Sequence, residues 1–163
     1  ISKLVFEIVR IEIETGFVGL CPMPGKFSSF DEDFLRLVKE LPQVVVTCAT
    51  QPKMMACSAT RLPEKLYNSE IKWFHIDVDD FQIPDEFSEE KWNSLLPILK
   101  ETISGGGGVI LNCVGGCGRS GMFLMRLLLE IGWSRDGALE RLRKVRPCAI
   151  ETDQQLSWAF GNG

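Results

Sequence analysis

The stretch LNCVGGCGRSGMF, residues 111–123, holds the residues best suited to chemistry. Cys113 precedes Arg119 by six positions, and three glycines lie between them. We expect this loop to join a buried strand to an apolar helix, so that backbone N–H groups converge at the helix N-terminus. Unpaired donors and the helix dipole favour an anion there. The spacing therefore predicts an oxyanion site with a cysteine beside it.

Sulfur and guanidinium groups suit attack on a phosphate ester. The field of a helix N-terminus favours the thiolate of Cys113, which is the nucleophilic form of cysteine. Arg119 offers a planar fork that can hold two phosphoryl oxygens at once. The residues that we expect around the phosphate are Val114, Gly115, Gly116, Cys117, Gly118 and Arg119.

The leaving oxygen of such an ester needs a proton, so a general acid must come from another segment. An acidic loop at 77–85, which follows an expected strand, offers four carboxylates. These candidates are Asp77, Asp79, Asp80 and Asp85.

The hydrophobic pattern predicts the elements that position these loops. We expect strands at 17–20, 44–48, 72–78 and 109–112, and helices at 28–41, 88–103, 120–133 and 154–160. Ser28 and Asp31 read as a capping box, and Pro97 predicts a kink. Strands that alternate with helices indicate an α/β fold with a mainly parallel central sheet of about four to five strands flanked by helices. Active sites of such sheets lie at the C-terminal ends of the strands, where the cysteine loop falls.

Composition narrows the classes of partner. The chain has 163 residues with 45% apolar content, which fits a single domain over 1–163. A net charge of −4 argues against nucleic acid or an anionic membrane as the partner. No run of about 18 apolar residues occurs, and acids interrupt the N-terminal apolar stretch, unlike a signal peptide. We expect a soluble, cytoplasmic monomer.

Six cysteines are scattered along the chain, and we expect free thiols because a chain of this size needs no disulfide bonds to stabilise its fold. The spacing of Cys113 and Cys117 gives little support for zinc, and the sole histidine, His75, reads as structural. We therefore expect no metal and no cofactor.

The motif C113-VGGCG-R119-S120 resembles the cysteine-dependent protein tyrosine and dual-specificity phosphatases, most of all the cyclin-dependent kinase-associated phosphatase group. The segments VGLCPMPGK, DDFQIPD and RPCAIETDQQ extend the resemblance over most of 17–156. It implies a phosphatase-type domain with a catalytic loop at 112–120, an acid loop at 77–85 and a phosphocysteine intermediate. The substrate that it implies is a phosphoprotein that carries phosphotyrosine, with phosphoserine and phosphothreonine as a further class. A protein kinase is a candidate partner.

The same resemblance assigns roles to single residues. Cys113 is the nucleophile, Arg119 binds phosphate, and Ser120 stabilises the departing thiolate. The spacing from Asp80 to Pro84 matches the family's acid, with Asp79 as the second choice. Gln155, or its neighbour Gln154, matches a glutamine near the hydrolytic water, although both also suit the start of an amphipathic helix.

Asn112 departs from the family, which has histidine before the nucleophile. Asparagine can still donate and accept hydrogen bonds. The sequence leaves open an active phosphatase, a phosphate-binding pseudophosphatase that has lost turnover, and a rhodanese-like sulfurtransferase. A cysteine protease with Cys113 as nucleophile and His75 as base would leave Arg119 without a role. Cys117 reads as a packing residue, and either it or Cys48 is a candidate to protect an oxidised Cys113 as a disulfide.

Overall fold

A five-stranded sheet forms the centre of the computed structural model, which describes residues 5–161. Its order is β1-β2-β5-β3-β4. The strands are β1 (Val9–Ile13), β2 (Gly16–Cys21), β3 (Val44–Thr47), β4 (Lys72–His75) and β5 (Gly108–Asn112). β1 pairs antiparallel with β2, and all other pairs are parallel. The expected α/β fold with a mainly parallel sheet is confirmed.

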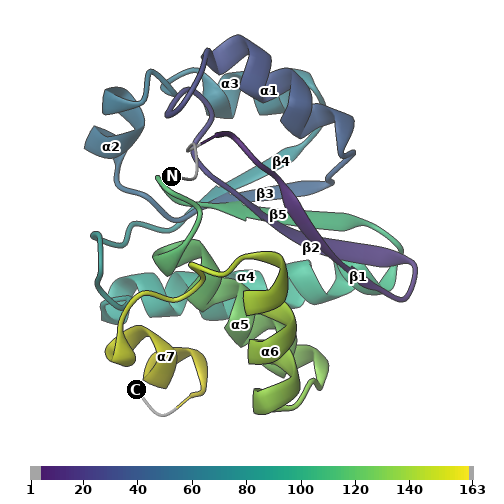
Figure 1. Ribbon diagram of the computed structural model, residues 1–163. Coiled ribbons are helices and arrows are strands. Elements are labelled where there is room, and N and C mark those ends of the chain that lie inside the picture. The colour runs from purple at the N-terminus through teal and green to yellow at the C-terminus, as the bar shows by residue number, and fades with distance from the viewer. Residues whose placement is uncertain (1–4, 162–163) are drawn as a thin grey trace.

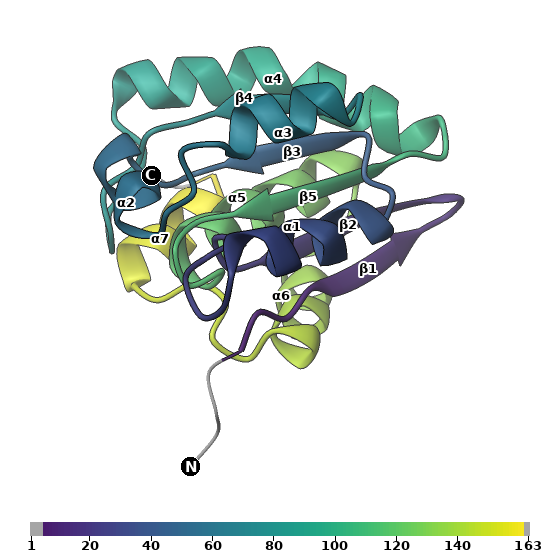
Figure 2. The ribbon, with the colours of Figure 1, turned by 90° about the horizontal axis from the view of Figure 1, so that it is seen from above.

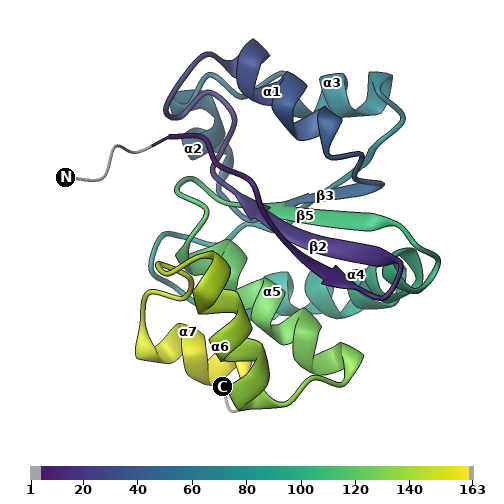
Figure 3. The ribbon, with the colours of Figure 1, turned by 45° about the vertical axis from the view of Figure 1, so that its right-hand side comes forward.

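Helices cover both faces of the sheet, as Figures 1 and 3 show. One face carries α1 (Phe30–Lys39), α2 (Gln51–Ala56) and α3 (Leu62–Asn68). The other carries α4 (Glu86–Ser104), α5 (Gly118–Ile131), α6 (Arg135–Val145) and α7 (Asp153–Ala159). None of the helices in residues 5–161 is long and apolar enough to cross a membrane.

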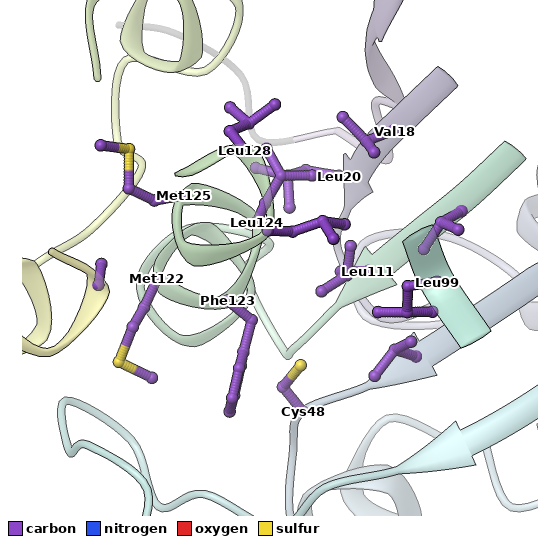
Figure 4. Close-up of a cluster of buried hydrophobic side chains, with 14 of the residues drawn as sticks. Val18, Leu20, Cys48, Leu99, Leu111, Met122, Phe123, Leu124, Met125 and Leu128 are labelled. Atoms are coloured by element: carbon purple, nitrogen blue, oxygen red, sulfur yellow. The ribbon is translucent and has the colours of Figure 1, made fainter. Parts of the chain in front are cut away.

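Two buried clusters fill the space between the sheet and its helices. The larger one joins the sheet to α4 and α5, and Figure 4 shows Leu111 of β5 and Leu20 of β2 beside Leu124 and Leu128 of α5. Because α5 is apolar on nearly every side, it is held firmly against the sheet, and its first turn is fixed relative to the strand ends.

Strand register brings four loops to one edge. Cys21 pairs with Asn112, Asn112 with Thr47, and Thr47 with His75, so the last residues of β2, β5, β3 and β4 form one row. The parallel direction of these strands places the loops that follow them side by side, as seen from above in Figure 2. The cysteine loop and the acidic loop therefore meet at the C-terminal edge of the sheet.

The structure corrects several expected element boundaries. The strand expected at 72–78 ends at His75, and the helix expected from Ser120 begins two residues earlier, at Gly118. Ser29, not Ser28, caps α1, because its side chain accepts from the Glu32 N–H. α4 continues through Pro97 over 19 residues. The sequence patterns had indicated neither β1 nor α2, α3 and α6.

Candidate active site

The cysteine loop spans the short connection between β5 and α5. Cys117 is the N-cap of α5, and the first intrahelical bond runs from Gly121 N to Cys117 O at 3.0 Å. The amides of Gly118, Arg119 and Ser120 precede that bond, so they belong to the donors that a helix leaves without intrahelical partners. Together with the helix dipole they favour an anion at this end of α5, and the predicted oxyanion site stays a prediction.

Gly116 lets the loop pack against the end of β2. Its φ is +73°, and a β-carbon there would lie 2.6 Å from the carbonyl carbon of Cys21. The Met23 N–H also donates to Val114 O at 2.9 Å. Any other residue type at 116 would push the loop away from the sheet.

Arg146, which the sequence had not singled out, holds the outside of this loop. Its Nη2 donates to Gly115 O at 2.7 Å and its Nε to Gly116 O at 3.1 Å. Because the C=O and N–H groups of a peptide chain point in different directions, fixing these carbonyls outward leaves neighbouring amides free to face an anion. Only the place of Arg146 as the first residue of the segment RPCAIETDQQ hinted at this role.

A disulfide joins Cys117 of the loop to Cys148, which follows α6. The expectation of free thiols is therefore wrong for this pair, and Cys117 is not a simple packing residue. The two cysteines are 31 residues apart in sequence, and only the return of the chain through α5 and α6 brings their Cα atoms to 5.2 Å. Cys21, Cys48, Cys57 and Cys113 are free and buried.

Cys113 lies at the base of the loop with 2% of its surface exposed. Its Sγ is 3.2 Å from the Ser120 hydroxyl, the contact that the predicted role of Ser120 requires. Burial, with the neighbouring Cys113 charge as the next cause, raises the pKa of Cys48 well above its ordinary value. Cys48 therefore stays a neutral thiol, which disfavours it as a partner for rapid disulfide exchange.

Asn112 belongs to a hydrogen-bonded row along the strand ends. Trp73 Nε1 donates to Thr47 Oγ1 at 2.8 Å, and that hydroxyl donates to Asn112 Oδ1 at 2.9 Å. Asn112 Nδ2 in turn donates to Met23 Sδ at 3.3 Å. The side chain of Asn112 thus ties β4, β3, β5 and the segment after β2 together beneath the loop.

Arg119 lies beneath the acidic loop and is 2% exposed. Its Nη1 donates to Val78 O at 3.0 Å, and its Nη2 lies 3.6 Å from Asp80 Oδ1. Its Nε has no hydrogen-bond partner among the described residues, although it is buried. A buried donor without a partner is costly, so this guanidinium is poised for an acceptor that a ligand can supply.

Three of the four candidate carboxylates can be distinguished by their contacts. Asp77 Oδ1 lies 2.7 Å from His75 Nε2, and Asp85 caps α4 by accepting from Ser88 N at 2.8 Å. Asp80 is 45% exposed and is the one beside Arg119. Asp79 contributes a backbone carbonyl to the turn that Gln82 N closes at 3.1 Å. The geometry thus favours Asp80 as the acid.

His75 has a structural environment. Besides Asp77, its Nε2 lies 2.6 Å from Ala49 O, and its ring stacks on Trp73. These contacts hold the end of β4 next to the start of the acidic loop.

Gln155 is fully buried and links the last segment to the acidic loop. Its Oε1 accepts from Glu151 N at 2.9 Å and Thr152 N at 3.3 Å, and its Nε2 donates to Gln82 O at 3.1 Å. Gln154 is exposed. Its partners make Gln155 a support for the acidic loop, and a water-positioning role for either glutamine stays a prediction.

Neither a protein-family model nor a curated protein matches the sequence. Solved structures do match. A kinase-associated phosphatase with its catalytic cysteine replaced by serine has a TM-score of 0.81 at 21% identity, over 97% of this chain and 94% of that one. PTPMT1 in complex with PI(5)P has a TM-score of 0.73 at 18% identity, over 94% and 93%. A human tyrosine phosphatase-like serine/threonine/tyrosine-interacting protein has 0.63 at 13%, over 94% and 93%.

These neighbours show the fold of the chain, which is that of the cysteine-dependent protein tyrosine and dual-specificity phosphatases. Among them, the likeness to the kinase-associated phosphatase extends over nearly the whole of both chains.

Proposed function

We propose that this protein is a phosphoprotein phosphatase that works through a phosphocysteine intermediate. The observation that carries the proposal is the convergence of Cys113, the helix N-terminus and the buried Arg119, whose Nε lacks a partner among residues 5–161, at one sheet edge. A phosphate dianion supplies acceptors for Arg119 and for the loop amides, and it lies within the field that favours a thiolate.

In the first step, the Cys113 thiolate attacks phosphorus and forms the S–P bond while the ester P–O bond breaks. Asp80 in its protonated form gives its proton to the leaving oxygen, and its position 3.6 Å from Arg119 Nη2 keeps its carboxyl group next to the bound phosphoryl group. Arg119 follows the charge on the equatorial oxygens through the transition state.

In the second step, water attacks phosphorus and the S–P bond breaks. Asp80, now ionised, accepts a proton from that water. The Ser120 hydroxyl, 3.2 Å from Sγ, donates to the departing thiolate. Gln155 supports this step by holding the acidic loop through Gln82 O.

A pseudophosphatase that binds phosphate without turnover is the second candidate, because Asn112 stands in place of histidine. The side chain of Asn112 bonds to Thr47 and Met23 at the strand ends, and neither of these partners lies in the loop. A sulfurtransferase gives the Asp80–Arg119 pair and the Gln155 link no function, so we do not favour it.

As substrate residues we propose phosphotyrosine, with phosphoserine and phosphothreonine as a further class. Protein kinases are candidates for the protein that carries them. The loop residues 114–118 contain no basic side chain for additional phosphates. A cytoplasmic location, which we also propose, exposes the Cys117–Cys148 disulfide to cellular thiols.

The test is phosphate release from an aryl phosphate and a phosphotyrosine peptide by the wild type and Cys113→Ser. We expect turnover only with the wild type, and equal rates would refute the mechanism. Asp80→Asn should lower kcat by roughly 10²- to 10⁴-fold on phenyl phosphates, with a smaller loss on substrates whose leaving groups are very acidic. Asp79→Asn is the matched control, and the opposite pattern would move the acid by one residue.

A further inference from the structure

Glu151 places a second carboxylate at the phosphate loop. A β-carbon on Gly118 would overlap Glu151 Oε1, so the carboxylate lies directly against the first residue of α5. The amide of Gly118 is one of the donors at the helix N-terminus, and it stabilises the charged form of this carboxylate. The carboxylate thus lies beside the donors that we assign to phosphate.

The backbone around Glu151 is held in a rare conformation. Ile150 is buried and β-branched, yet its φ is +65°, a left-handed value that such residues seldom adopt. Its N–H donates to Cys117 O at 3.2 Å, while Glu151 N donates to Gln155 Oε1 at 2.9 Å. Strained residues persist where the surrounding structure demands them, often at functional sites. These bonds direct Glu151 toward the loop.

Two charged groups face this carboxylate from neighbouring elements. Glu151 is an exposed residue, but partial desolvation of its carboxyl group against the loop raises its pKa above the ordinary value of 4.5, and the negative charge of Asp80 on the acidic loop raises it further. The Gly118 amide and the Arg119 charge on α5 oppose the shift without cancelling it. A bound oxyanion adds negative charge to the same space and therefore favours the neutral acid still more.

We propose that Glu151 is a further binding residue of the phosphate site, which takes up one proton from solvent when the oxyanion binds and donates that O–H to a phosphate oxygen. The inference rests on the proposed function for the identity of the ligand. The proton converts the carboxylate from a like charge that repels the ligand into a donor. Ionised Glu151, in contrast, competes with the ligand for the Gly118 amide.

Linkage gives the direction of the pH dependence. Binding that takes up a proton weakens as pH rises, because fewer protons are available, and the affinity changes by at most tenfold per pH unit for one proton. The loss begins above the pKa of Glu151 in the free protein. Asp80 and Arg119 also face this space, and neither is altered in the variants compared below.

The experiment measures binding of inorganic sulfate, whose charge is constant between pH 5 and 8, to Cys113→Ser, in which residue 113 cannot titrate. We expect the Kd of this parent to rise about tenfold or more from pH 5 to 8. In Cys113→Ser/Glu151→Gln the rise should be at least threefold smaller, with tighter binding than the parent at pH 8. Cys113→Ser/Asp153→Asn, which removes an exposed acid two residues away, should behave as the parent.

An unchanged pH dependence in Glu151→Gln, or weaker sulfate binding than the parent at pH 8, would overturn the inference. A second measurement needs no change at position 151. Calorimetric titration of the parent with sulfate at pH 6, in two buffers of different ionisation enthalpy, should show net proton uptake, and none would refute the proposal. These outcomes can be distinguished from a failure of the proposed function. If the wild type shows no turnover, the phosphatase activity is refuted, but sulfate binding still tests the role of Glu151.

Discussion

The disulfide between Cys117 and Cys148 permits a quantitative prediction for Cys148→Ser. The bond closes a loop of 31 residues that contains α5 and α6. Loop-closure entropy for that length is about 12 cal/mol/K, which corresponds to about 3.7 kcal/mol at 25 °C. Cys148 is exposed, so serine in its place should leave the local packing unchanged. The main loss is therefore the constraint on the unfolded chain.

We expect the free energy of unfolding of Cys148→Ser to be lower by about 2 to 4 kcal/mol, with the smaller figure allowing for structure retained in the unfolded chain. For a domain of this size, the change corresponds to a fall in Tm of about 4 to 16 °C. Urea denaturation followed by circular dichroism measures it. The wild type treated with a phosphine reductant is the matched control, because it should show the same loss, whereas Cys148→Ser should not respond to the reductant.

Equal stability of the oxidised wild type and Cys148→Ser would refute this reasoning. Activity gives a second result from the same samples. Arg146 keeps its bonds to Gly115 O and Gly116 O when the disulfide is absent, so the loop should retain its shape and kcat should fall by less than about tenfold. A total loss of turnover in the folded variant would show that the disulfide, not Arg146, sets the loop conformation.

Three further predictions concern Asn112, the free cysteines Cys21 and Cys48, and Glu151. Asn112→Ala leaves the Thr47 hydroxyl without its acceptor, so the free energy of unfolding should fall by about 1 to 3 kcal/mol, measured by urea denaturation. A change under about 0.5 kcal/mol, the size of a surface effect, would contradict the role of the hydrogen-bonded row at the strand ends. Burial raises the pKa of both Cys21 and Cys48, so neither should react with iodoacetamide in the native protein at pH 7, and mass spectrometry of tryptic peptides would detect any exception. The raised pKa of Glu151 means that the folded state binds its proton more readily than the unfolded state. The wild type should therefore lose stability relative to Glu151→Gln as pH rises from 4.5 through the folded pKa, and a difference that is constant from pH 4 to 8 would contradict the shift.

Local patterns in the sequence were sufficient for the elements that carry the chemistry. The run VVVTC and the stretch VILN are mainly apolar and bounded by turn signals, and α4 has an apolar stripe of Trp92, Leu95 and Leu99. Residues close together in sequence form these features, so periodicity reports them directly. The spacing of Cys113 and Arg119 across a glycine-rich loop likewise predicts an oxyanion site without knowledge of the remaining chain.

Features that depend on distant segments could not be read in this way. The strand β1 is the exception, because VRIEI alternates apolar and charged residues and pairs with the next element, β2, so its signal was local. Arg146, Cys148 and Glu151 lie near one another in sequence. They contact the cysteine loop only because α6 returns the chain to that loop. A cysteine pair 31 residues apart carries no signal of its pairing, because connectivity depends on the path between.

Asn112 shows both kinds of information, from the sequence and from the tertiary structure, in one residue. The sequence determined that asparagine precedes the nucleophile and that it can both donate and accept a hydrogen bond. Tertiary structure alone decided that its partners are Thr47, 65 residues away, and Met23, 89 residues away. Parallel strands align their C-terminal ends whatever their separation along the chain, and this alignment, not local spacing, places Asn112 and Asp80 at one loop.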